Sequence, residues 1–220
     1  MQPTQRAPRG ILAIWNDRRA GTQTEYEAWY RGDHLPDRLS IPGFRTAWRY
    51  RAIEGEPEYF TFYETDTPEV LFSEAYVNRV ENPTELTRRI MSGTFTNATR
   101  ALLTQAARWG MLRGAVAVSV RFDAKPGSSL ETTLRAIASR DEALSAELWT
   151  PTRPDAPTPV SAEQRLRGPD KSVAGAALVE TTTDEEARAL ALGLREALGT
   201  GPHIGVYRLF CSLRRDDLFR

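Results

Sequence analysis

The chain has few of the residues that most often mark covalent or metal chemistry. Its 220 residues include one cysteine, Cys211, and two histidines, His34 and His203. A single cysteine excludes an intrachain disulfide and a cysteine-rich zinc site, and we expect it to pack as a small apolar residue. His203 lies far from His34 in the sequence and is expected to be a local hydrogen-bonding residue. Two histidines this far apart are a weak metal signal, so we predict no bound metal and no cofactor. The single cysteine fits a reducing compartment.

The chain also lacks a charge excess and any long apolar run. Lys+Arg and Asp+Glu number 29 each, so no overall field attracts nucleic acid or an anionic membrane. No stretch approaches the roughly 18 apolar residues that a membrane span needs, and residues 11–15 are too short for a signal-peptide core. The remaining composition, 40% hydrophobic and 26% charged, is that of a globular protein. We predict a cytoplasmic protein with no membrane or nucleic-acid partner.

The first part of the chain predicts a strand followed by an amphipathic helix. The continuous apolar run at residues 11–15 is typical of a strand covered on both faces. Thr24 then begins a helix, because its hydroxyl and the Glu27 carboxylate three residues later can form a capping box. Pro36 limits the continuation of this helix, since proline lacks the N–H that an interior position donates.

The rest of the first half adds two strands, two helices and a closing strand. Alternation over residues 44–52 and the aromatic run at 59–63 predict the two strands of a hairpin. Thr67 and Asn82 each precede a proline and a nearby acidic residue, which marks the start of two helices. Residues 101–109 predict a fourth strand, which completes the β-α-β-β-α-β order of a ferredoxin-like unit.

The second half repeats this order with little residue identity. It predicts strands at 115–122, 144–149, 173–180 and 204–213, and helices at 129–139 and from 183 to about 199. Thr183 and Glu186 make a capping box for the last helix. Residues 151–172 carry five prolines, so we interpret them as an extended surface loop. The predicted fold class is α+β, with tandem ferredoxin-like units at 9–110 and 111–220.

The first half resembles the EthD-like group of the dimeric α/β-barrel superfamily over roughly residues 9–110. The motifs that carry the resemblance are Trp29-Tyr30, His34-Leu35-Pro36-Asp37-Arg38, Ile41-Pro42-Gly43-Phe44 and Asn82-Pro83-Thr84. In that superfamily two ferredoxin-like sheets, usually from two chains, enclose a barrel. The resemblance therefore implies an intrachain dimeric-α/β-barrel-like arrangement, a small-molecule ligand and, as an open alternative, further pairing into a homodimer.

The resemblance implies several functions, because a fold does not fix chemistry. Members include small-molecule monooxygenases, lactone isomerases, cyclases, dehydratases and haem enzymes, and some EthD-like enzymes use a histidine in the region of His34. The leading interpretation is a cofactor-independent lyase, isomerase or oxygenase. The alternatives are a non-catalytic ligand-binding or stress-associated barrel protein, and a haem-dependent barrel enzyme.

His34 is the candidate catalytic residue. It follows Tyr30 by four positions and Tyr26 by eight, so it shares their helix face and should point at the sheet or the barrel mouth. An imidazole beside Asp33 or Asp37 can transfer protons near neutral pH. The structural alternative is a helix-end histidine that bonds a backbone carbonyl and fixes the turn. The second half has no equivalent histidine, which predicts one site per chain.

One central strand supplies candidate anion-binding residues. Arg49 and Arg51, with Arg45 on the same face, can bind a planar oxyanion if that face lines the barrel. Arg49 or Arg51 would then stabilise an anionic substrate. The structural alternative is that the arginines pair with Glu58 or Glu64 on the neighbouring strand.

Aromatic side chains on adjoining strands complete the candidate binding set. Such residues can wall an apolar pocket for a ring-containing ligand, and ordinary core packing explains them equally well. The full set is Trp15, Trp48, Tyr50, Tyr59 and Tyr63, of which Trp48, Tyr50 and Tyr63 are the predicted substrate contacts.

Overall fold

The structure is a computed structural model that describes residues 7–153 and 160–219. Its strands are β1 (Gly10–Arg18), β2 (Phe44–Glu54), β3 (Tyr59–Thr65), β4 (Phe95–Trp109), β5 (Val116–Phe122), β6 (Ser145–Pro151), β7 (Gly175–Thr181) and β8 (His203–Arg214). Its helices are α1 (Gln23–Trp29), the π-helix η1 (Tyr30–His34), α2 (Leu35–Ser40), the 3-10 helix η2 (Pro68–Phe72), α3 (Glu74–Glu81), α4 (Glu85–Gly93), α5 (Ser129–Ile137), α6 (Ala162–Arg167), α7 (Asp184–Leu198) and the 3-10 helix η3 (Arg215–Phe219).

The strands form one closed barrel in the order β1-β3-β2-β8-β5-β7-β6-β4. Within each half the order is fourth, first, third and second strand, which is the ferredoxin-like arrangement. β2 pairs with β8 and β4 pairs with β6, both antiparallel, and these two seams join the halves. The predicted fold class is confirmed, because one α+β chain closes a barrel of the dimeric α/β type. The unit boundary near residue 110 stays a prediction.

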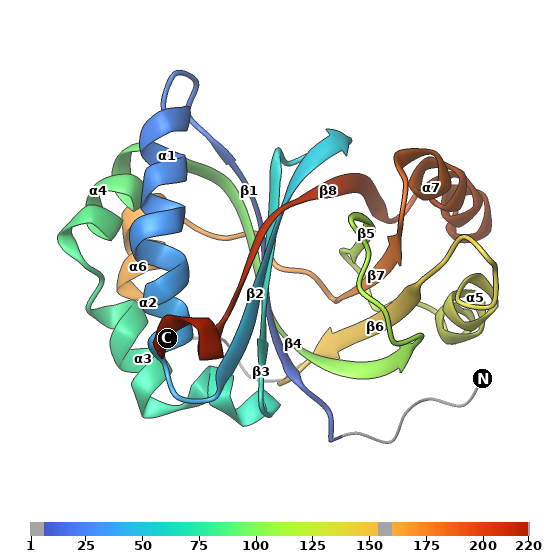
Figure 1. Cartoon of the computed structure of the whole chain (residues 1–220), viewed down its shortest axis with the longest axis horizontal. Coiled ribbons are helices and arrows are strands. Elements are labelled where there is room, and N and C mark those ends of the chain that lie inside the picture. The colour runs from blue at the N-terminus through green and yellow to red at the C-terminus, as the bar shows by residue number, and fades with distance from the viewer. Residues whose placement is uncertain (1–6, 154–159, 220) are drawn as a thin grey trace.

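The helices cover the barrel on two opposite sides, as Figure 1 shows. α1, α2, α3, α4 and α6 lie beside the sheet of the first half, and α5 and α7 lie beside that of the second. Because strand side chains alternate between the two faces of a sheet, the chain has three apolar cores. One fills the barrel and one lies beneath each helical layer. No helix among the described residues is long and apolar enough to cross a membrane.

The predicted capping box at the first helix is wrong. α1 begins at Gln23, one residue before Thr24, and it has no side-chain cap. The Glu27 carboxylate instead bonds the Arg49 guanidinium on β2. A buried charge-assisted contact with a strand residue is stronger than a local cap on an exposed helix end, so the tertiary partner takes the carboxylate.

The first helix also continues past the proline that was expected to limit it. α1, η1 and α2 follow one another without a break up to Ser40. The Leu35 N–H bonds the Tyr30 carbonyl, which is the i to i−5 contact of a π-helix. In an α-helix the ring of Pro36 would clash with the carbonyl four residues earlier, and this wider turn accommodates it.

Two helices and one strand of the structure start at residues that bear on the predicted ones. The helix predicted from Thr67 is the short η2, and α3 begins after Ser73, whose hydroxyl accepts a hydrogen bond from the first turn. β4 begins at Phe95, earlier than the predicted strand. The capping box of Thr183 and Glu186 is confirmed at the start of α7.

The segment predicted as an extended surface loop, residues 151–172, contains helix α6. Ser161 caps this helix, and the buried Glu163 forms an ion pair with Arg38 of α2. Residues 154–159 lie outside the described part of the chain. The loop prediction is therefore wrong at α6, because a short capped helix buries one charged side chain against an opposite charge.

Candidate functional site

His34 lies between the helical layer and the outer face of the first-half sheet. It ends the π-helical turn η1, and only 6% of the residue is exposed. Its ring centroid lies 4.3 Å from that of Trp29, 5.3 Å from Tyr30 and 6.5 Å from Tyr63 on β3. His34 therefore packs on the face that its spacing from Tyr30 predicts, and it points at the sheet rather than into the barrel.

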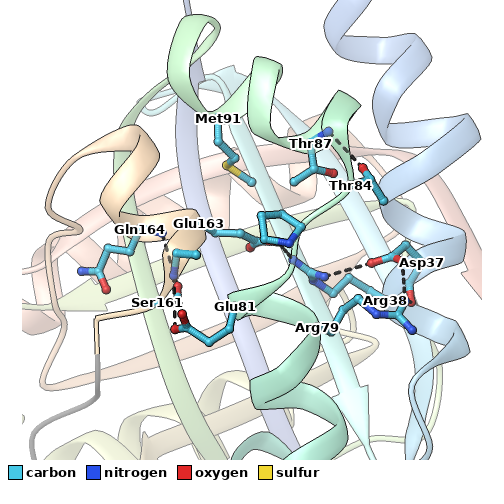
Figure 2. Close-up of polar contacts among 12 residues, drawn as sticks. Asp37, Arg38, Arg79, Glu81, Thr84, Thr87, Met91, Ser161, Glu163 and Gln164 are labelled. Atoms are coloured by element: carbon cyan, nitrogen blue, oxygen red, sulfur yellow. Dashed lines mark hydrogen bonds and ion pairs between the residues drawn. The ribbon is translucent and has the colours of Figure 1, made fainter.

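The two carboxylates that flank His34 in the sequence bond other groups. Asp33 accepts a hydrogen bond from the Thr87 hydroxyl at 3.0 Å. Asp37 forms an ion pair with Arg79 of α3, which is drawn in Figure 2. Neither aspartate therefore orients the imidazole, in contrast to the arrangement expected from the sequence.

Burial lowers the pKa of His34 well below its ordinary value. The nearby positive charges of Arg38, Arg167 and Arg49 lower the pKa further, because each disfavours the imidazolium form. The ring is therefore neutral near pH 7. Its Nδ1 atom is buried and has no hydrogen-bond partner among the described residues. A backbone carbonyl thus does not fix the ring through this atom.

Four neighbouring side chains share this property, and we call them the polar cluster. His34 Nδ1, the Tyr63 hydroxyl, the Thr61 hydroxyl and Arg49 Nε are buried without a hydrogen-bond partner in the part of the chain that the structure describes. Thr61 and Tyr63 stand two positions apart on β3 and share one face of the sheet, and Thr61 is the register partner of Arg49 on β2. Buried polar groups are nearly always paired, so this concentration marks a candidate ligand site.

Arg49 belongs to the polar cluster but is not a free cation. Its two terminal nitrogens donate to the Glu27 carboxylate at 2.6 and 2.9 Å, and its side chain is fully buried. The guanidinium carbon also lies 4.1 Å from the Tyr30 ring centre and 4.6 Å from that of Tyr59. Because Glu27 neutralises this charge, Arg49 is a poor stabiliser of an anionic substrate.

The other two arginines of β2 lie at the surface. Arg51 pairs with Glu58 at 3.0 Å, which is the cross-strand alternative weighed from the sequence. Arg45 pairs with Asp66 at 3.1 Å, and both side chains are about half exposed. The structure therefore places Arg51 and Arg45 outside the barrel and in ion pairs.

The predicted aromatic contacts divide between two compartments. Trp48 and Tyr50 belong to the core inside the barrel, whereas Tyr63 belongs to the core beneath the first helical layer. The Tyr50 hydroxyl donates to Glu180 at 3.1 Å. Strand alternation explains this division, because Trp48 and Tyr50 stand on the barrel-facing side of β2, whereas Tyr63 stands on the helix-facing side of β3. The structure therefore brings His34 together with Tyr63 and Arg49, but not with Trp48, Tyr50 or Arg51.

The barrel interior holds a charged group that the sequence analysis missed, which we call the ionic cluster. It consists of Arg113, Glu64, Glu147 and Glu180. Arg113 donates to Glu147 at 2.7 Å, to Glu180 at 2.8 Å, and to Glu64. All three glutamates are at most 4% exposed. A sequence signal existed, because each glutamate stands two positions from a barrel-facing residue on a largely apolar strand.

Arg113 and the neighbouring Arg108 set the protonation of Glu147 and Glu180 in the ionic cluster. Burial acts to raise the pKa of Glu147, but Arg113 and Arg108 outweigh burial and hold it below its ordinary value. Burial raises the pKa of Glu180, and Arg113 opposes that rise only in part. Arg108 contacts Glu147 at 2.8 Å. The ionic cluster is therefore a paired network whose balance depends on Arg113.

Helix α6 from the second half packs beside the polar cluster. Figure 2 shows Glu163 of α6 facing Arg38 of α2, with Asp37 on the other side of that arginine. Arg167 of α6 lies 5.5 Å from the ring centre of Phe95, which neighbours Trp29. The surroundings of His34 are therefore built from both halves of the chain.

Two cavities lie elsewhere on the molecule. One of about 900 Å³ lies beside β4 and β6, and one of about 420 Å³ lies at the start of β2. His34 lines neither of them. His34 is nearly fully buried, so a substrate reaches its ring only when the packing around the ring opens.

The residues present do not fit a haem. Iron in haem is held by a histidine, cysteine, methionine or tyrosine, and the described lining of the larger cavity contains none of these. His34 is closed in by the rings of Trp29 and Tyr63. No group of three or more metal-ligating side chains occurs among the described residues either.

The remaining histidine and the cysteine take local roles. His203 is 55% exposed in its side chain and contacts Asp123 at 3.0 Å. Cys211 is a free, half-buried thiol on β8 that packs against the first-half core, and burial raises its pKa. Both positions agree with the structural interpretations made from the sequence.

Comparisons with known proteins show the fold. No family model matches the chain, and no curated protein matches it. Among solved structures, an anthrone oxidase-like protein superposes with a TM-score of 0.59 at 11% identity, over 97% of this chain and 96% of the other. A proposed monooxygenase from Fusobacterium nucleatum superposes with a TM-score of 0.55 at 9% identity, over 96% of both chains.

A proposed chlorite dismutase is a further structural neighbour. It superposes with a TM-score of 0.53 at 10% identity, over 96% of this chain and 98% of the other. At these identities the likeness establishes a shared fold, that of the dimeric α/β-barrel proteins, over nearly the whole chain. Function has to be argued from this chain's own residues.

Proposed function

We propose that the protein is a small-molecule enzyme of EthD-like type in which His34 removes a proton from the substrate. The single observation that carries this proposal is the buried, neutral imidazole whose Nδ1 has no partner among the described residues. A neutral imidazole has one unprotonated ring nitrogen that can accept a proton, and the lowered pKa makes His34 a weak base that suits an acidic substrate proton. The anthrone oxidase-like and monooxygenase neighbours support this proposal only as relatives in fold.

The reactions expected from the sequence share this first step. A lyase or an isomerase that acts on a carbon acid begins by removing a proton next to a carbonyl, and an oxygenase without a cofactor begins by forming a substrate anion. In each case His34 takes the proton, and the substrate carries the negative charge on its oxygen. The lowered pKa of His34 makes its imidazolium a good acid, which returns the proton readily to product.

The hydroxyls of the polar cluster are better placed than the arginines to stabilise the substrate anion. Tyr63 and Thr61 have hydroxyls without partners in the described part of the chain, and hydroxyl donors aimed at a developing charge stabilise it. Arg49 is already neutralised by Glu27 and positions the aromatic rings around it. We therefore assign anion stabilisation to Tyr63 and Thr61.

The proposed enzyme needs no second chain to complete its barrel. The eight strands of one chain close it, and α6 of the second half packs against α3 and α4 beside the polar cluster. A homodimer therefore stays a prediction that the barrel itself does not require.

Deuterium exchange tests the proposed proton transfer without knowledge of the full reaction. The protein is incubated in D2O with a panel of small carbon acids, such as anthrone, a butenolide and a 1,3-diketone, and exchange is followed by NMR. We expect the wild type to accelerate exchange of at least one compound. His34→Gln should slow that exchange by about 10²- to 10⁴-fold, the range of general acid–base catalysis.

The controls separate catalysis from binding. His203→Gln replaces the exposed histidine of the second half and should leave exchange at the wild-type rate. Exchange that survives in His34→Gln refutes the assigned role. Saturable binding of a panel member without any exchange would identify a non-catalytic ligand-binding protein of the same fold.

A further inference from the structure

The cavity beside β4 and β6 has an apolar floor and a basic rim. We call it the β4–β6 cavity, and its volume is about 900 Å³. It lies beside this pair of hydrogen-bonded strands, and the first turn of α5 and the segment that leads into β7 also line it. Leu103, Leu130, Leu148 and Val173 contribute apolar lining. This size and lining are typical of small-molecule sites.

Four basic side chains line this cavity: Arg100, Lys125, Arg153 and Lys171. Three of them are held by neutral groups. Arg100 donates to the Tyr76 hydroxyl at 2.6 Å, and Lys171 donates to the Asn97 side-chain carbonyl at 2.9 Å.

Arg153 lies 3.8 Å from the ring centre of Phe72. These contacts with Tyr76, Asn97 and Phe72 orient the cations without neutralising them. Carboxylates attract two of the cations from a longer range: Asp170 and Glu163 act on Arg100, and Glu69 acts on Arg153. None of the four forms a salt bridge within the described residues, whereas most arginines discussed above are paired with a carboxylate. The positive charge at the rim is therefore available to a ligand.

The acids of the same cavity are already paired. Asp170 bonds Arg167 at 2.6 Å in a buried contact, and Glu131 bonds Arg135 at 3.2 Å along α5. Asp170 raises the pKa of Arg100 only as a minor influence, after burial and the Tyr76 contact. The cavity therefore carries a net positive charge.

The positions of the lysines are a second, independent indication that the cavity binds an anion. The sequence contains only two, Lys125 and Lys171, and both line the β4–β6 cavity. Lys125 stands in the loop before α5, and Lys171 stands in the segment before β7. A lysine ammonium is a compact charge on a flexible stem, so two of them can adjust to one carboxylate.

We propose that the β4–β6 cavity binds an amphipathic organic anion, a carboxylate with an apolar body. The apolar lining takes the body of the ligand and removes its surface from water. The rim cations take the carboxylate through charge-assisted hydrogen bonds. This site does not include His34 and stands independently of the proposed proton transfer.

The two lysines give a direct measurement of this binding. Reductive methylation with [13C]formaldehyde keeps the lysine charge and yields two lysine NMR signals beside that of the amino terminus. Lys125→Arg and Lys171→Arg assign the two signals. The labelled protein is then titrated with decanoate, with decanol of equal chain length, and with acetate, which has the same head group.

The proposal predicts that decanoate shifts both lysine signals and saturates. We expect decanoate to bind at least about tenfold more tightly than decanol or acetate, which corresponds to about 1.4 kcal/mol. The double variant Lys125→Gln/Lys171→Gln, followed by calorimetry on unlabelled protein, should bind decanoate about tenfold more weakly. Arg19→Gln/Arg188→Gln removes the same charge at exposed positions outside the cavity and should bind as the wild type does.

Three outcomes overturn the proposal. If decanoate leaves both lysine signals unchanged, the cavity does not bind such a ligand. Equal affinity for decanol shows that the rim charge is not used, and equal affinity for acetate shows that the apolar lining is not used. Decanoate affinity that the double lysine variant preserves places the binding elsewhere.

Discussion

The ionic cluster in the barrel and the polar cluster beneath the first helical layer are both buried, yet they differ in how far their hydrogen bonds are satisfied. In the ionic cluster, Arg113 reaches Glu64, Glu147 and Glu180, and each carboxylate has at least one cationic partner. In the polar cluster, His34 has a buried atom without a partner in the described part of the chain.

This difference separates a structural role from a functional one. A fully paired network in a low-dielectric interior rigidifies a fold, and the three glutamates fix the positions of β3, β6 and β7 around Arg113. Groups left unpaired cost stability and are expected where a protein gives up stability for function. The ionic cluster therefore holds the barrel together, and the polar cluster is the candidate site.

The largest test of this comparison removes the centre of the ionic cluster. Arg113→Met leaves three buried glutamates with too little positive charge around them. Breaking a buried ion pair by removing one partner costs about 3–5 kcal/mol, so we expect a loss of that size in the free energy of unfolding. Urea unfolding followed by circular dichroism measures it.

The control for Arg113 is an arginine that is exposed and does not belong to a buried network. Arg188 pairs with Glu54, and its side chain is 48% exposed. Arg188→Met should therefore change the free energy of unfolding by less than about 0.5 kcal/mol. At low pH the glutamates are protonated and need no counter-charge, so the difference in unfolding free energy between the wild type and Arg113→Met should be smaller there than at neutral pH. A loss below about 1 kcal/mol at neutral pH would contradict the structural role.

The second test uses the pH dependence of His34. Its folded-state pKa lies below the unfolded value of about 6.5. Between these two pKa values the unfolded chain binds a proton that the folded chain does not, so stability falls as the pH is lowered. The slope is at most about 1.4 kcal/mol per pH unit, and the contribution is fully present only above the unfolded pKa.

A matched pair of histidine variants isolates this slope from that of the carboxylates. Urea unfolding of the wild type, His34→Phe and His203→Gln is measured between pH 5 and pH 7.5. We expect His34→Phe to lose less stability on acidification than the wild type, whereas the exposed His203 shows what a surface histidine contributes. Identical pH profiles for the wild type and His34→Phe would show that His34 is protonated freely in the folded state.

The comparison also shows what the sequence can and cannot predict. The order of strands and helices follows from periodicity and capping, which are local, and so does the helix face on which His34 lies beside Tyr30. The partner of Glu27 was not predictable in this way. A capping box and a buried pair with Arg49 both suit a glutamate at that position, and only the packing of α1 against β2 decides between them.

The two faces of the sheet caused the other difference between the expected and observed site. Alternation correctly separates Arg49 from Trp48 and Tyr50, but it does not tell which face closes around the barrel. Local sequence patterns do not predict which polar atoms of the polar cluster lack a hydrogen-bond partner. Whether His34 Nδ1 has a partner depends on side chains from other elements, such as Tyr63 of β3, whose ring centre lies 6.5 Å from that of His34.

The smallest test compares two buried tyrosine hydroxyls that differ in their partners. Tyr50 donates to Glu180 in the barrel, and a hydrogen bond to a charged group contributes about 1.5–3 kcal/mol. Tyr50→Phe should therefore lower the free energy of unfolding by about 1.5 kcal/mol. Tyr63 has a hydroxyl without a partner among the described residues, so Tyr63→Phe should leave stability unchanged or raise it slightly. Equal losses for the two variants would mean that the Tyr63 hydroxyl is satisfied in solution and that the polar cluster is as structural as the ionic cluster.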